Sequence, residues 1–175
     1  MATSHSVGTR IKADQSGQAM LEFAIIASLV ITLVFAIVDF GRAFNSLQVM
    51  IGLTRQGSNL ASRGDTLTVS AAAVVSGDAP LDLKTNGEVI VTSVTNNSKN
   101  NVITGQVSQG GISQVSKVGT GVGAIATVPT PVVAMLQPGK TIYITEVFYT
   151  YHPITPIGGL LNAVMPSMLY EAAYF

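Results

Sequence analysis

An uninterrupted apolar run constrains this chain more than any other feature. It begins at Phe23 and ends at Phe40, reads FAIIASLVITLVFAIVDF, and has only Ser28 and Thr32 as polar members before Asp39. As an α-helix these residues extend roughly 27 Å at 1.5 Å per residue, close to the thickness of a bilayer's hydrocarbon core. We therefore expect a transmembrane helix over this run.

The flanks of the run indicate its orientation and its length. Arg10 and Lys12 precede it, and positive charge on that side predicts a cytoplasmic N-terminus and an exported C-terminal part. A cleavable secretory signal is the simplest alternative. However, the sequence beyond the run keeps a helical spacing, and no proline occurs before Pro80. We expect one helix from about residue 16 to residue 62, capped by Gly64. The apolar or small positions that recur at steps of three and four are Phe44, Leu47, Ile51, Thr54, Ser58 and Ala61.

Small side chains recur at every fourth position of the apolar run, at Ala24, Ser28, Thr32 and Ala36. This spacing lets two helices approach closely where lipid supplies no hydrophobic driving force. Chance is the alternative, because Ala, Ser and Thr are common in membrane helices. The stripe is thus a candidate helix-packing surface.

Ionisable residues stand at both ends of the run. Glu22 precedes it, and a carboxylate inside hydrocarbon costs about 2.5–3.5 kcal/mol, so we expect a partner for this side chain. Asp39 and Arg42 follow, one helical turn apart, and are expected to pair and to mark the membrane interface.

The stretch from Gly17 through Gln18 to Glu22 and Phe23, GQAMLEF, resembles the class III prepilin signal. In that signal a prepilin peptidase cuts after the glycine, which makes Glu22 the fifth residue of the mature chain. The resemblance then extends over GQAMLEFAIIASLVITLVFAIVDFGRAFNSLQVMIGLTRQGSNLASRG, which is similar to the N-terminal region of TadE-like proteins, the pseudopilins of tight-adherence (Tad) secretion systems. The segment ITEVFYTYHPITPIGGLL resembles their C-terminal part more loosely. Nothing in residues 65–141 is recognised.

The resemblance implies a structural subunit of a type IV (Tad-like) pilus. Its leader would be residues 1–17, its long helix residues 18–63 and its exported β-rich domain residues 64–175. Prepilin peptidase would cut between Gly17 and Gln18, and the inner-membrane pilus assembly machinery would move the chain from inner-membrane lipid into a homo-polymeric filament at the cell surface.

In such a filament the expected partner of the Glu22 carboxylate is the amine of Gln18 on a neighbouring subunit, and Phe23 and the small stripe would pack against neighbouring helices. Two alternatives stay open: a minor pseudopilin, and a membrane-anchored periplasmic binding domain that does not polymerise.

Downstream of Gly64 the composition favours strands, and we expect an α+β fold: a long N-terminal α-helix followed by a small antiparallel sheet. Residues 88–95 and 102–108 predict a hairpin, and residues 141–152 predict a central strand. SAAAVVSG suggests a short second helix. Residues 109–130 predict a loop or sheet edge, where two prolines exclude a regular helix. The tail after residue 160 suggests a short helix broken by Pro166.

The remaining composition argues against other functions. Net charge is zero and only 10% of residues are charged, so no nucleic-acid partner is expected. The chain has no cysteine, and His152 is the only histidine left after a cut at Gly17. The glycines at 119–123 imitate a dinucleotide turn without its helix. We expect no enzyme, metal or cofactor, with an exported enzyme as the disfavoured alternative. The downstream acids lack metal-loop spacing and are interpreted as solvated loop carboxylates: Asp65, Asp78, Asp82, Glu88, Glu146 and Glu171.

Overall fold

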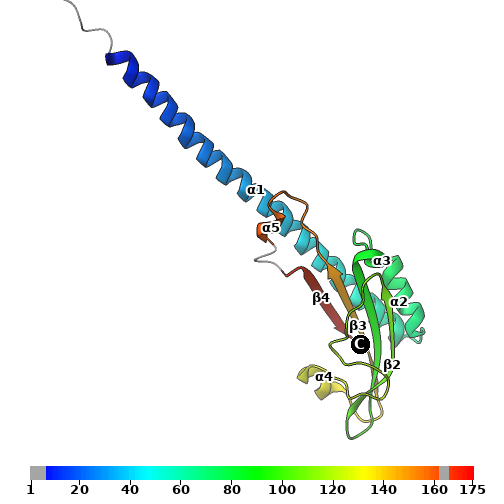
Figure 1. Cartoon of the computed structure of the whole chain (residues 1–175). Coiled ribbons are helices and arrows are strands. Elements are labelled where there is room, and N and C mark those ends of the chain that lie inside the picture. The colour runs from blue at the N-terminus through cyan, green and yellow to red at the C-terminus, as the bar shows by residue number, and fades with distance from the viewer. Residues whose placement is uncertain (1–6, 162–165) are drawn as a thin grey trace, which may run out of the picture.

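The computed structural model describes residues 7–161 and 166–175. One long helix, α1 (Val7–Ser62), leads into a globular part built on a four-stranded antiparallel sheet. In Figure 1 the N-terminal half of α1 stands clear as a rod, whereas its C-terminal half lies along the globular part. The predicted α+β class is confirmed. The other elements are α2 (Leu67–Ser76), α3 (Leu83–Asn86), β1 (Gly87–Asn96), β2 (Asn101–Gly110), α4 (Thr130–Met135), β3 (Thr141–Thr150), α5 (Gly158–Leu161) and β4 (Met168–Tyr174).

Both ends of α1 can be compared with the sequence. The helix begins earlier than the expected residue 16, at Val7. At the other end Gly64 adopts a left-handed φ of +106°, and the amide of Asp65 donates to the carbonyl of Leu60 at 3.2 Å. Glycine adopts this conformation without a Cβ clash, so the predicted C-cap is confirmed.

The sheet has the strand order β2-β1-β3-β4. The predicted hairpin is confirmed as β1 and β2, whose turn is closed by Asn97: its side-chain oxygen accepts from the amides of Lys99 and Asn100 at 3.1 and 2.8 Å. The predicted central strand is confirmed as β3, which pairs with β1 on one side and β4 on the other. The predicted second helix is α2.

The C-terminal tail corrects a prediction. Residues after Pro166 form β4 instead of a helix, with Leu169 opposite Tyr149 and Ala173 opposite Thr145. Without β4 the edge of β3 would leave its backbone groups unpaired, and this long-range pairing outweighs the local helix preference of the tail. The first part of the tail lies in α5, and residues 162–165 fall outside the described residues.

The buried stripe of α1 also differs from the predicted one. Thr54, Ser58 and Ala61 are buried as expected, but Phe44 is 63% exposed. The buried positions further up are small or flexible instead: Ala43, Ser46 and Met50. The packed face therefore combines small side chains, which let the helix backbone approach the sheet closely, with the large apolar side chains of Met50 and Leu53.

The two faces of the sheet have different covers. Val89 and Val91 of β1 and Val147 of β3 pack in one core cluster with buried residues of α1 and α2. Val94 and Ile144, on the other face, pack with residues 118, 126 and 136 of the segment between β2 and β3. This segment contains α4, for which Pro129 is the N-cap. This corrects the prediction that the two prolines exclude a helix there. Pro129 precedes the helix and Pro131 lies in its first turn, where a proline loses no hydrogen bond.

Candidate functional site

The apolar half of α1 is unpartnered. Within the described residues α1 is the one helix long and apolar enough to cross a membrane; its most apolar 18-residue window has a mean hydropathy of 2.7, and none of that window is buried. Phe23 is 73% exposed and Leu29 65%. From residue 16 to residue 38 no side chain is buried. An exposed apolar surface of this length marks a membrane or protein interaction site.

The residues around the predicted cleavage position lie at the start of this surface. Gly17 is within the helix and has open space around it. The side-chain amide of Gln18 donates to Oε1 of Glu22 at 3.0 Å, and both side chains are exposed. The Glu22 carboxylate therefore has a neutral partner one turn away on its own helix, and its charge is uncompensated by this contact.

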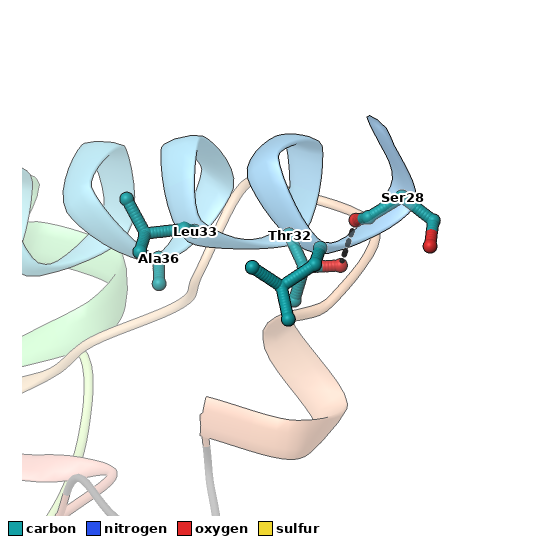
Figure 2. Close-up of a pocket in the computed structure, with 5 residues that line it drawn as sticks. Ser28, Thr32, Leu33 and Ala36 are labelled. Atoms are coloured by element: carbon teal, nitrogen blue, oxygen red, sulfur yellow. Dashed lines mark hydrogen bonds between the residues drawn. The ribbon is translucent and has the colours of Figure 1, made fainter. Parts of the chain in front are cut away.

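The small stripe forms a shallow groove, lined by Ser28, Leu29, Thr32, Leu33 and Ala36. Figure 2 shows the Thr32 hydroxyl turned back to the carbonyl of Ser28, at 2.8 Å. The Ser28 hydroxyl likewise donates to the carbonyl of Ile25 at 2.8 Å. Because both hydroxyls are satisfied within the helix, the groove can face lipid or another helix without an unpaired donor. Ala24, the first member of the stripe, is exposed.

From residue 16 onward, Asp39 is the first buried side chain on α1, and it anchors the helix to the globular part. Its Oδ1 accepts from the amide of Ile154 at 3.0 Å, and its Oδ2 accepts from the Thr155 hydroxyl. The Tyr151 hydroxyl donates to the Asp39 carbonyl at 2.8 Å. The carboxylate thus bonds to the loop after β3 and not to Arg42, the partner expected from sequence.

Burial raises the pKa of Tyr151 above its ordinary value, and the nearby Asp39 charge adds to this, whereas Arg42 opposes it. Tyr151 therefore stays a neutral hydrogen-bond donor at physiological pH. Arg42 itself is exposed. Asp39 follows directly after the unburied residues 16–38, so its hydrogen bonds fix the position of the globular part relative to the apolar half of α1.

Two acids interpreted as solvated are in fact buried in the sheet, which corrects the sequence analysis. Glu146 of β3 is 0% exposed and Glu88 of β1 6%. Oε1 of Glu146 accepts from the amide of Lys117 at 2.8 Å and from the Tyr170 hydroxyl at 3.0 Å, and its Oε2 accepts from the Ser116 hydroxyl.

Glu88 has an equivalent role, since its Oε2 accepts from the amide of Gln114. The two carboxylates therefore hold the loop between β2 and α4 over the outer face of the sheet. Burial raises the pKa of Tyr170, and the charge and hydrogen bond of Glu146 raise it further. The ammonium of Lys117 lies 3.5 Å from the centre of the Tyr170 ring, which adds a cation–π contact. A cluster built from three separate segments has no signal in local sequence patterns.

The weaker sequence motifs carry no catalytic arrangement in the residues that the structure describes. His152 is exposed in the loop directly after β3. The glycines at 119, 121 and 123 have positive φ values, and the next helix, α4, begins only at Thr130. Among the described residues no group of three or more His, Cys, Asp or Glu side chains is placed to hold a metal ion.

Comparison with known proteins places the resemblance on the same segment as the unpartnered surface. Residues 17–59 match the family model of TadE-like proteins. No curated protein and no solved structure matches the chain. The resemblance to TadE-like proteins is thus confirmed for residues 17–59, which lie within the long helix, and the exposed apolar half of that helix fits association with a membrane. The looser resemblance of residues 142–175 stays a prediction.

Proposed function

We propose that this chain is a structural subunit of a type IV (Tad-like) pilus that assembles through α1. The observation that carries the proposal is the division of α1 into two halves. Its C-terminal half packs on the sheet, whereas residues 16–38 present an unpartnered apolar surface. Nearly all of this surface lies within residues 17–59, the segment that matches TadE-like proteins. Such a surface needs lipid before assembly and other helices afterwards.

The subunit has two stages in this scheme. In the first, the apolar half of α1 spans the inner membrane with the N-terminus in the cytoplasm. Prepilin peptidase then removes residues 1–17, and the assembly machinery moves the mature chain into a filament at the cell surface. The small stripe with Ala24, Ser28, Thr32 and Ala36 lets neighbouring helices pack closely there.

Glu22 sets the register of this packing. Cleavage after Gly17 converts the backbone amide nitrogen of Gln18 into a terminal ammonium group. On a neighbouring subunit, this ammonium is the counter-charge that the Glu22 side chain lacks in its contact with the neutral Gln18 side chain. Two charges in a low-dielectric helix bundle attract strongly, and the pair is net favourable because both groups are otherwise desolvated. Phe23, exposed next to Glu22, adds apolar contact area.

Substitution of Glu22 tests this scheme. Glu22→Ala is expected to leave the mature N-terminus at Gln18, measured by mass spectrometry, and to abolish filaments in sheared surface fractions. Asp65→Ala, which removes an exposed acid beyond the helix, is the matched control and is expected to assemble normally. Normal filaments from Glu22→Ala would refute the charge-pair mechanism.

Processing is tested separately at Gly17. Gly17→Leu is expected to leave the leader attached, because the larger side chain would not fit the subsite of a peptidase that recognises glycine. A mature N-terminus at Gln18 in this variant would exclude that specificity.

The second candidate is a minor pseudopilin or a membrane-anchored domain that does not polymerise. It is favoured by the family match itself, because TadE-like proteins are pseudopilins and the match ends before the sheet. Electron microscopy of sheared filaments labelled for this chain separates the two. Continuous labelling along the filament supports a main subunit, whereas labelling of the membrane fraction alone supports the second candidate.

A further inference from the structure

A depression of about 440 Å³ lies where α1 enters the globular part. Three segments that are distant in sequence form its wall: one face of α1, the connection between α2 and α3, and the end of β3 with the following loop. Its lining residues are Ile37, Val38, Gly41, Arg42, Asn45, Ser46, Pro80, Leu81, Tyr149, Tyr151 and His152. The scheme of assembly through α1 uses none of its polar groups.

The lining changes character along the helix axis. Ile37 and Val38, which are 63% and 42% exposed, form the end nearest the apolar surface. Arg42 follows about one turn later, or roughly 6 Å along the axis. Asn45 and His152 complete the polar end, and both are exposed. The depression is therefore amphipathic, with its apolar end towards the proposed membrane.

Arg42 is the charged side chain among the residues that line the polar end. The guanidinium of Arg42 is exposed, and the nearest acid on its helix, Asp39, uses both carboxylate oxygens on the loop after β3. Two further acids, Asp78 and Asp82, raise the pKa of Tyr149 and so lie in its neighbourhood. Asp78 accepts from the amide of Leu83 at 2.7 Å, and Asp82 caps α3. These acids accept from backbone amides, and the side chain of Arg42 interacts with the neutral hydroxyl of Tyr151, so Arg42 is not paired with a carboxylate and can bind an incoming anion.

We propose that this depression binds the phosphate headgroup of a membrane phospholipid, with Arg42 as the principal phosphate ligand. Asn45 and the His152 imidazole add hydrogen bonds to the headgroup, and the first part of an acyl chain runs along Ile37 and Val38. The proposal rests on the membrane stage of the proposed function and deepens it by naming a lipid-binding site.

The position of the depression favours lipid over a free anion. The apolar run ends at Phe40, so Arg42 reaches the level at which phosphates of the outer leaflet lie when the run spans the bilayer. Basic groups at this level attract anionic headgroups, and guanidinium binds phosphate oxygens in a bidentate manner. A free phosphate ion would make no use of the apolar end.

The test uses the full chain purified in detergent and phosphatidylglycerol as the probe, with retained lipid measured by native mass spectrometry. Arg42→Gln is expected to weaken lipid binding about tenfold, the loss of roughly one charge-assisted contact. Arg42→Lys keeps the charge but loses the bidentate geometry, and is expected to bind more weakly than the wild type and more tightly than Arg42→Gln. Arg55→Gln, exposed roughly 20 Å further along α1, is the matched control and is expected to bind as the wild type does.

Equal lipid retention by Arg42→Gln and the wild type would overturn the proposal, as would complete displacement of the lipid by millimolar inorganic phosphate, which would indicate a free-anion site. Circular dichroism of each variant separates loss of the site from loss of the fold. Because lipid binding is read without filaments, failure of assembly in cells leaves this result unaffected, and a chain that never enters the membrane fraction would refute the proposed function instead.

Discussion

Substitution of Gly57 by alanine is expected to loosen the packing of α1 on the globular part. Gly57 lies where α1 crosses both the sheet and α2. A Cβ atom at this position would be 2.8 Å from Oγ1 of Thr145 and 2.8 Å from Cγ2 of Val74. Real Cβ contacts are longer, so the helix would have to move away from β3 and α2. Gly52, a little more than one turn earlier on the same helix, has open space around it and provides the matched control.

The expected magnitudes follow from two opposing effects. Alanine is preferred over glycine inside a helix by about 1 kcal/mol, and Gly52→Ala should keep most of this gain. Overpacking in a well-filled core costs about 1–3 kcal/mol. In Gly57→Ala the cost exceeds the gain, because the contacts lie on two separate elements and cannot both relax through one side chain. The two variants should differ in free energy of unfolding by about 2 kcal/mol.

Thermal unfolding of the full chain in detergent, followed by near-ultraviolet circular dichroism, measures this difference. For a chain of this size about 2 kcal/mol corresponds to a separation in Tm of about 4–8 °C. Gly52→Ala is expected above the wild type and Gly57→Ala below it. A Gly57→Ala variant as stable as Gly52→Ala would refute the close approach of α1 to β3.

Three further outcomes are expected. Glu146→Ala should destabilise the fold by about 3 kcal/mol, because it leaves buried donors of the covering loop unpaired, whereas Glu171→Ala, at a partly exposed position of β4, should cost below about 1 kcal/mol in the same denaturation assay. Asp39→Ala should speed hydrogen exchange at the Ile154 amide at least about tenfold, measured by mass spectrometry, since that amide loses its acceptor; unchanged exchange would exclude the anchor. Burial and Glu146 raise the pKa of Tyr170 in the folded chain, so stability present below the ordinary pKa of about 10 should fall as the pH rises beyond it. Tyr170→Phe should flatten this fall in Tm between pH 9 and 11, and an equally steep fall would contradict the assignment.

Local patterns were sufficient for the elements whose signals lie within a few consecutive residues. The apolar run, the absence of proline before Pro80 and the glycine at position 64 determine a long helix with a defined end. Alternating β-branched residues around an Asn-rich turn determine the β1–β2 hairpin, and the same reasoning finds β3. These features depend on periodicity and backbone preference, which are properties of the local chain.

Only the tertiary structure decided where the polar groups go and which face of α1 is packed. The sequence around Glu146 does not distinguish a buried carboxylate from an exposed one. Glu146 is buried because the Lys117 amide in the loop after β2 and the Tyr170 hydroxyl in β4 donate hydrogen bonds to it. The Asp39 carboxylate accepts hydrogen bonds from a loop more than a hundred residues away in sequence, and not from the nearby Arg42. The tail becomes β4 because β3 offers an unpaired edge. In each case the stabilising partner is distant in sequence, and a charge or strand edge can be buried only when the whole fold brings that partner into place.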